Sequence, residues 1–241
     1  MKVNKRMPID DSSLRPSERI CATVAEPNVR SMRKEGERAL REGAHLVEFR
    51  IDYLRNVSES EALDGLSPYS DRGVITIKPR TQGGLYSGSE EELCRSIEKW
   101  ASIRPAYIDV DAAFVHVRPE ILGKIRGESV RTIISWHDFA STASTRMLLQ
   151  NAEEALNIGD VAKIVSTARS LEDNAKILRL YGQVTSPHRL VAFCMGFRGQ
   201  ISRVLCLPLG SPFTYAYAGR TRAAPGQPSL NALREVLKAI E

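Results

Sequence analysis

Short runs of apolar, β-branched and aromatic residues recur along the chain and begin about 24 to 33 residues apart. Segments with helical spacing of apolar positions, such as VRSMRKEGERALREGA and SEEELCRSIEKWA, lie between them. This alternation predicts eight strands, each followed by a helix. The eight runs are RICATVA from Arg19, HLVEFRI from His45, GVITIKP from Gly73, AYIDVDA from Ala106, RTIISWHDF from Arg131, VAKIVSTA from Val161, RLVAFCM from Arg189 and FTYAYAG from Phe213.

Several of these runs are almost continuously apolar, as is typical of parallel strands that helices cover on the outside. Eight such units in 241 residues fit an α/β fold of the (β/α)₈ TIM-barrel type in a single domain. We expect residues 1–18 to form an N-terminal extension and residues 19–241 to form the barrel. An open, doubly wound sheet is the alternative, but no glycine-rich fingerprint follows the first strand and no Walker motif occurs.

Composition narrows the classes of function. The excess of 34 basic over 29 acidic residues gives a net charge of +5, but these residues are scattered, so we expect no nucleic-acid partner. No stretch has the roughly 20 continuous apolar residues of a membrane span, and the N-terminus lacks the apolar region of a secretory signal. We therefore expect a cytoplasmic protein without a membrane partner. The four cysteines lack metal-ligand spacing and read as buried thiols: Cys21, Cys94, Cys194 and Cys206.

In a barrel of this kind, polar residues at the carboxyl ends of the strands face the active-site mouth. Lys163 lies in VAKIVSTA, and burial there would favour loss of its proton and leave a nucleophilic amine. His137 ends the preceding strand and carries a group that exchanges protons near neutral pH. For each residue alone a structural role is at least as frequent: an ion pair for Lys163, a bond to Asp138 for His137. Together they indicate imine chemistry with proton transfer.

Other polar residues at the mouth suggest a hydroxylated, anionic ligand. Glu48, Arg50 and Asp52 alternate along VEFRID and so share one face of the strand, either as a salt-bridge ladder or as ligand-binding groups. Arg203 follows the seventh strand at what we expect to be the start of a helix, and Gln227 ends the loop AAPGQ. Both are positioned to hold a carboxylate under a Pro-Gly lid, although an exposed position is the usual one for such residues.

The chain resembles the type I 3-dehydroquinate dehydratase family over nearly its whole length, from ICATVAE to the C-terminal helix. Five motifs in order carry the resemblance: VEFRID, SWHDF, VAKIV, MGFRGQISR and AAPGQPS. The resemblance implies a cofactor-free lyase of the shikimate pathway that removes water from 3-dehydroquinate by syn elimination. It also implies a homodimer.

The resemblance also assigns roles to residues. Lys163 would form an imine with the C3 ketone, and His137 would move a proton from C2 to the leaving C1 hydroxyl. Arg203 and Gln227 would hold the substrate carboxylate, while Glu48 and Arg50 would bind ring hydroxyls.

Three positions of the substrate site depart from the family pattern. In IKPRTQGG, Lys78 stands where the family usually has an arginine and Gln82 where it has a glutamate, so one bidentate donor and one carboxylate near the histidine are changed. Arg80 is a candidate replacement for the arginine. Ala223 replaces a serine that is common in the lid. These changes affect the expected efficiency rather than the reaction type.

Three other functions remain open on the sequence. A class I aldolase also uses a barrel lysine, but a phosphate site is not evident at the last two strands. A barrel that binds a small acid without turnover is consistent with the three departures. A nucleic-acid binder has only the basic composition in its favour.

Overall fold

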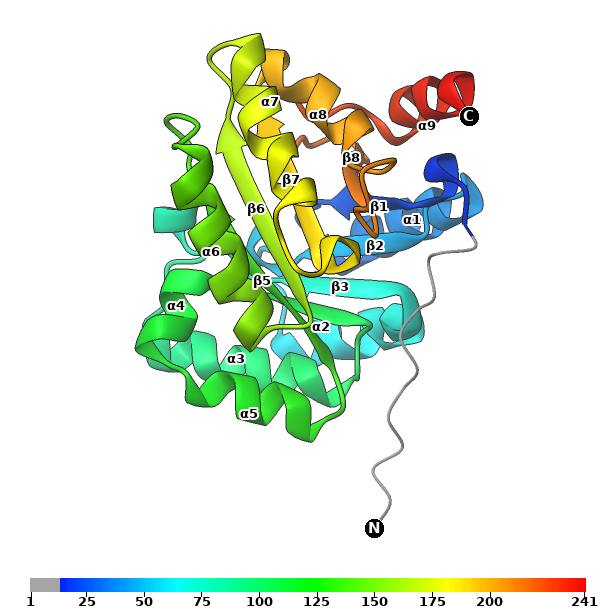
Figure 1. Ribbon diagram of the computed structural model, residues 1–241. Coiled ribbons are helices and arrows are strands. Elements are labelled where there is room, and N and C mark those ends of the chain that lie inside the picture. The colour runs from blue at the N-terminus through cyan, green and yellow to red at the C-terminus, as the bar shows by residue number, and fades with distance from the viewer. Residues whose placement is uncertain (1–13) are drawn as a thin grey trace.

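The computed structural model describes residues 14–241 as eight parallel strands surrounded by helices (Figure 1). Consecutive strands pair from β1 to β7, and β8 pairs with β1. The expected (β/α)₈ barrel is confirmed, and all eight expected strands are present. They are β1 (Ile20–Val24), β2 (Leu46–Arg50), β3 (Gly73–Thr76), β4 (Tyr107–Asp111), β5 (Arg131–His137), β6 (Val161–Thr167), β7 (Leu190–Met195) and β8 (Thr214–Ala218).

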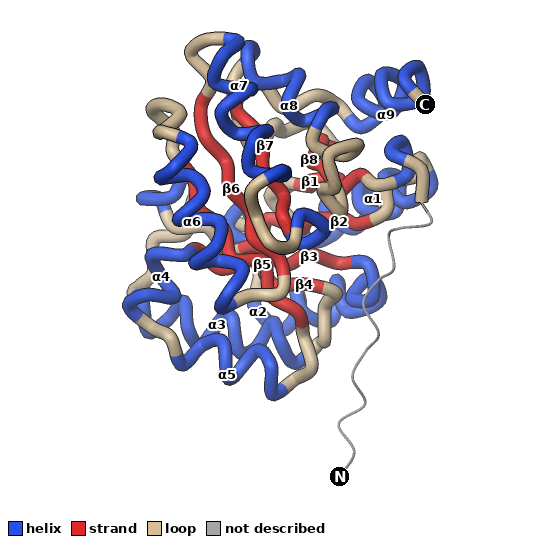
Figure 2. Tube along the Cα trace, in the orientation of Figure 1, coloured by secondary structure: helices blue, strands red, loops and turns tan. Residues whose placement is uncertain are grey.

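Helices form the outer layer and the strands the inner one, as Figure 2 shows by colour. Several helices begin at a side-chain cap that the sequence supplies: the Ser89 hydroxyl accepts a bond from the Glu92 amide, and Asn28, Ser144 and Ser229 act in the same way. The α-helices are α1 (Val29–Arg41), α2 (Glu59–Leu66), α3 (Glu90–Ser102), α4 (Ala112–Val117), α5 (Glu120–Gly127), α6 (Thr145–Ile158), α7 (Leu171–Leu178), α8 (Gln200–Leu205) and α9 (Leu230–Ile240).

Alternation along each strand separates two apolar clusters. Val47 and Phe49 of β2 pack outward against the helices, while Leu46 of the same strand packs inside the barrel with Val74 and Ile133. These inner residues close the floor of the barrel with aliphatic and aromatic side chains. Inside the barrel, polar side chains appear only two to four residues further along the strands, as Glu48 and Arg50 do after Leu46. The fold thus confines the polar interior to the carboxyl-terminal end.

The two edge strands of the sheet within the described residues are β7 and β8, and side chains complete the seam between them. The Tyr181 hydroxyl, from the short helix η6 (Arg179–Gly182), donates to the Ala192 carbonyl at 3.1 Å and accepts from the Ala192 amide at 2.7 Å. Ser202 of α8 accepts from the Cys194 amide at 2.9 Å. Backbone groups of β7 that a ladder would satisfy are therefore satisfied by side chains.

The N-terminal residues that the structure describes lie against the C-terminal helix. The short helix η2 (Pro16–Glu18) contacts α9, and the Ser17 amide donates to Glu241 Oε1 at 2.5 Å. Most of the expected N-terminal extension, residues 1–13, lies outside the described residues. Between residues 14 and 241, no helix combines the length and the apolar character that crossing a bilayer requires. All four cysteines are buried and free, as expected.

Replacing Tyr181 by Phe is expected to destabilise the fold by about 1–3 kcal/mol, because the amide and carbonyl of Ala192 would lose a buried partner. The measurement is urea unfolding of the variant and the native protein. Tyr53→Phe, at a half-buried position away from the seam, is the control and should lie within about 0.5 kcal/mol of native. An equal effect of both substitutions would contradict a special role for the seam.

Candidate active site

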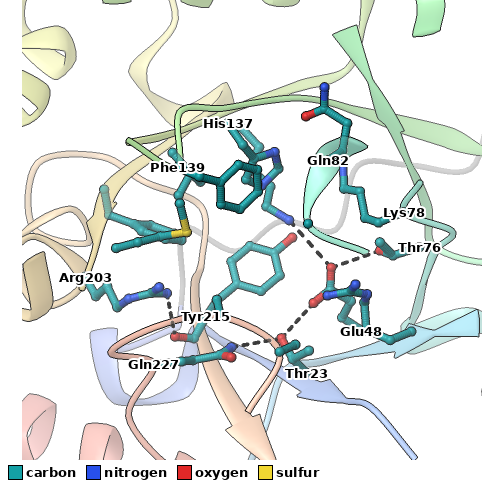
Figure 3. A pocket seen from close by; sticks show the side chains of 18 residues that line it. Thr23, Glu48, Thr76, Lys78, Gln82, His137, Phe139, Arg203, Tyr215 and Gln227 are labelled. Carbon is teal, nitrogen blue, oxygen red and sulfur yellow. Dashed lines mark hydrogen bonds and ion pairs between the residues drawn. The ribbon is translucent and has the colours of Figure 1, made fainter. Parts of the chain in front are cut away.

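A cavity opens at the carboxyl ends of the strands (Figure 3). Nine of the residues that the sequence indicated line this one cavity, whereas Asp52 does not. The nine are Glu48, Arg50, Lys78, Gln82, His137, Lys163, Arg203, Ala223 and Gln227. Arg80, the candidate replacement for the family arginine, is exposed and lines a neighbouring groove instead. The alternation of side chains along parallel strands brings these distant positions together.

Lys163 extends from β6 into the base of the cavity and is 6% exposed. Its Nζ lies 2.9 Å from Asp109 Oδ2 and 3.5 Å from Glu48 Oε1, and it sits 4.3 Å from the centre of the Tyr215 ring. Burial acts to lower the pKa of Lys163, but the two carboxylates outweigh it and the pKa is raised above its ordinary value. The expectation that burial makes Lys163 a neutral amine at rest is therefore wrong.

Asp109 of β4 is a polar strand-end residue that the sequence marks as a candidate without assigning it a role. Its carboxylate is fully buried and binds two lysines: Lys78 Nζ lies 2.8 Å from Oδ1, and Lys163 Nζ lies 2.9 Å from Oδ2. The Ser135 hydroxyl donates to Oδ1 at 2.6 Å. Burial alone would raise the pKa of Asp109, but the two lysines hold it far below its usual range. Asp109 is therefore ionised throughout the ordinary pH range.

Glu48 and Arg50 both have partners already in place. Thr23 and Thr76 donate to the two carboxylate oxygens of Glu48 at 2.7 and 2.9 Å, the contacts drawn in Figure 3. Arg50 forms a two-point ion pair with Asp52, at 2.9 and 2.8 Å. The salt-bridge interpretation of VEFRID is thus correct for Arg50 and Asp52, while Glu48 faces Lys163 instead.

His137 ends β5 and reaches the cavity wall, where its ring stacks on Phe139 with centroids 5.7 Å apart. Asp138 does not hold the imidazole, because its carboxylate accepts from the amides of Ala140 and Ser141. The Nδ1 atom of His137 has no hydrogen-bond partner among residues 14–241. Burial, together with the nearby lysines, lowers the pKa of His137 well below its ordinary value. The imidazole is therefore neutral and able to accept a proton.

Arg203 reaches the cavity through the seam between β7 and β8. It is 1% exposed, its guanidinium lies 4.1 Å from the centre of the Phe193 ring, and its Nη1 donates to the Tyr215 carbonyl at 3.4 Å. It lies in the last turn of α8, which begins at Gln200, and not at the start of a helix as expected. No carboxylate of the described chain forms an ion pair with it, and burial lowers its pKa to about 10.

The loop after β8 lines the same cavity as Arg203. Gln227 is 3% exposed and donates from Nε2 to Thr23 at 3.1 Å, while its Oε1 has no partner within the described residues. Gly226 has φ of 69°, and a Cβ there would come within 2.4 Å of the Gly196 carbonyl, so the two backbones approach this closely only because residue 226 is glycine. The Gly196 amide also donates to the Pro225 carbonyl at 3.1 Å. The expected Pro-Gly lid is therefore docked on the loop after β7.

The sequence analysis also missed uncharged residues that complete the cavity. Three of them lie two positions from a recognised polar residue, which was the available signal, but small hydroxyl and apolar side chains occur at many such positions. Those on β1, β7 and β8 have no recognised polar residue on the same strand. The missed lining residues are Thr23, Thr76, Phe139, Val165, Phe193, Met195 and Tyr215.

Gln82 lines the same cavity as His137, and its replacement by Glu is expected to raise the pKa of the imidazole, because a nearby negative charge favours the imidazolium. Titration of His137 by NMR is the measurement. Glu90→Gln, on the exposed start of α3, should leave that titration unchanged. A titration of His137 that does not move in Gln82→Glu would show that position 82 is electrostatically separate from the imidazole.

Comparisons with known proteins agree in one family. The family model described as type I 3-dehydroquinase matches residues 20–241. Curated relatives named 3-dehydroquinate dehydratase include one from Methanocaldococcus jannaschii, which is 34% identical over an alignment of 229 positions that covers 92% of this chain and 99% of the relative. Another, from Thermococcus gammatolerans, is 37% identical and covers 86% of this chain and 94% of its own length.

Solved structures agree with these matches. The crystal structure of 3-dehydroquinate dehydratase from Geobacillus kaustophilus superposes with a TM-score of 0.84 at 26% identity, covering 92% of this chain and 90% of the other. The corresponding enzyme from Aquifex aeolicus gives a TM-score of 0.76 at 26% identity, with coverage of 91% and 97%. Since the family model, the relatives and the fold coincide over almost the full length, the chain belongs to the type I 3-dehydroquinase family.

Proposed function

We propose that the chain dehydrates 3-dehydroquinate to 3-dehydroshikimate through an imine on Lys163, as a carbon-oxygen lyase of the shikimate pathway. The family membership supports the reaction, and the cavity supports the mechanism. The catalytic unit in this proposal is the barrel of residues 19–241.

One observation supports a negatively charged substrate. Arg203 is a buried cation without a carboxylate partner in the described chain. The other three buried cations around the cavity are paired, Arg50 with Asp52, Lys78 with Asp109, and Lys163 with Asp109 and Glu48. A buried charge that stays unpaired is costly, so the pocket favours a ligand with one negative charge placed at Arg203. A substrate with a single carboxylate meets this requirement.

In the proposed reaction, the neutral amine of Lys163 attacks the C3 ketone, and the adduct loses water to give an imine. The protonated imine withdraws electrons and acidifies the hydrogens on C2. His137 is neutral and lies at the same cavity, so it removes one C2 proton. The imidazolium then protonates the C1 hydroxyl, which leaves as water from the same face. Hydrolysis of the imine releases the product and restores Lys163. This chemistry needs no metal or organic cofactor.

The remaining residues would bind the substrate. Gln227 donates one Nε2 hydrogen to Thr23 and would donate the other to the substrate carboxylate, which it would hold together with Arg203. Glu48 and Arg50 would bind ring hydroxyls with the hydrogen-bonding capacity that their partners leave. Ala223 would contribute only van der Waals contact, and Gln82 would contact the ligand from the loop after β3. The proposal includes a homodimer in the cytoplasm, and sedimentation of the purified protein tests the dimer.

Sodium borohydride added during turnover of 3-dehydroquinate is expected to reduce the imine and attach ligand mass to Lys163, because the hydride converts the imine to a stable amine. Peptide mass spectrometry locates the adduct. Lys163→Ala should give no adduct and no turnover, whereas Lys99→Ala, at an exposed ion pair, should behave as native. Turnover without an adduct in the native protein would rule out the imine mechanism.

Replacing Arg203 by Met is expected to raise KM about 10- to 100-fold, because a charge-assisted bond to the carboxylate contributes about 1.5–3 kcal/mol. The thermal midpoint should stay at or above the native value, since the variant removes an unpaired buried charge. Steady-state kinetics and calorimetry measure the two effects. Arg198→Met, on the exposed part of the same segment, is the control. A destabilised Arg203→Met with native KM would assign the arginine to folding.

A further inference from the structure

Two lysines share one buried carboxylate at the base of the cavity. Asp109 Oδ1 binds Lys78, which lies two residues after β3, and Asp109 Oδ2 binds Lys163 from β6. Lys78 is 5% exposed, and its ammonium also contacts the Ser135 hydroxyl. An ammonium has three N–H donors, so Asp109 and Ser135 occupy most of the hydrogen-bonding capacity of Lys78.

The surroundings of Lys78 differ from those of a cation that is free to bind an anionic substrate. Arg203 lacks an anionic partner, while Lys78 has one at 2.8 Å in the same cavity. A ligand carboxylate at Lys78 would have to compete with a fully buried carboxylate of the protein. Lys78 therefore acts mainly as the ion-pair partner of Asp109 and not as a ligand-binding residue.

The reaction requires Lys163 to lose its positive charge before it can attack a ketone. If Lys163 were the only cation on Asp109, that loss would leave a buried carboxylate without a partner, which is strongly unfavourable. Lys78 removes this penalty, because it stays bound to the same carboxylate. Glu48 also keeps partners when Lys163 loses its positive charge, because the hydroxyls of Thr23 and Thr76 donate to its two carboxylate oxygens.

We propose that Lys78 is a positioning residue whose charge neutralises Asp109 and thereby allows Lys163 to become the neutral, imine-forming amine. The inference rests on the proposed imine at Lys163. It predicts an effect on the proton equilibrium of Lys163 rather than on substrate affinity. Lys78 also faces His137, where its charge helps to hold the imidazole neutral.

The test is the pH dependence of imine formation, measured from pH 6 to 10 by rapid mixing with 3-dehydroquinate, borohydride quenching and mass spectrometry of the Lys163 peptide. In Lys78→Met the midpoint of the profile should move to higher pH, with a rate about tenfold lower at pH 7 and nearly native at the alkaline limit. Lys78→Arg keeps the charge and should keep the native midpoint. The double variant Lys78→Met/Asp109→Asn removes the unpaired carboxylate and should move the midpoint back toward native.

The outcomes separate the two proposals. If native protein gives no adduct at Lys163, the proposed function fails. If native protein gives the adduct but Lys78→Met keeps the native midpoint, or raises KM alone, Lys78 is a substrate-binding residue and the inference is overturned. Should Lys78→Met not fold, Lys78→Arg and the double variant still decide, because the inference requires a native midpoint in the first and a midpoint close to native in the second.

Discussion

Charged side chains inside a barrel must find partners there, and this constraint organises the whole cavity. Asp109 meets it most fully, since its two oxygens connect β4 to β3, β5 and β6 through Lys78, Ser135 and Lys163. The carboxylate therefore links side chains from four neighbouring segments of the barrel and also sets the charge balance of the two lysines. The apolar floor below it excludes water from this side, which strengthens each of these contacts.

The fold could be predicted from the sequence because parallel strands covered by helices leave a strong pattern. Buried on both faces, the strands appear as apolar runs such as RLVAFCM, and a lysine or histidine within a run stands out. The seam between β7 and β8 could not be predicted. It depends on a tyrosine and a serine from two different helical segments that satisfy single backbone groups of β7, and no sequence pattern marks such long-range contacts.

The sequence could predict which residues form the candidate site, but not which of their charged groups form ion pairs. Lys163, His137 and Arg203 were recognisable by type and position, and the structure brings them to one cavity. Their electrostatics depend on neighbours in space. The pKa of Lys163 is raised because Asp109 and Glu48 outweigh burial, and the sequence alone does not show that these carboxylates come within 2.9 and 3.5 Å. Arg203 reaches the same cavity only because the seam admits a side chain from α8.

A raised pKa at Lys163 is compatible with imine chemistry, because the charge on its nitrogen changes at each step of the proposed reaction. The carboxylates that favour the ammonium also favour the protonated imine, which places a positive charge on the same nitrogen. In the proposed mechanism they therefore stabilise the species from which His137 would remove the C2 proton. They oppose only the neutral amine that precedes it, and there Lys78 and the hydroxyls of Thr23 and Thr76 compensate Asp109 and Glu48. An arrangement with neither carboxylate would favour the neutral amine in the first step but would weaken the electron sink on which the elimination depends.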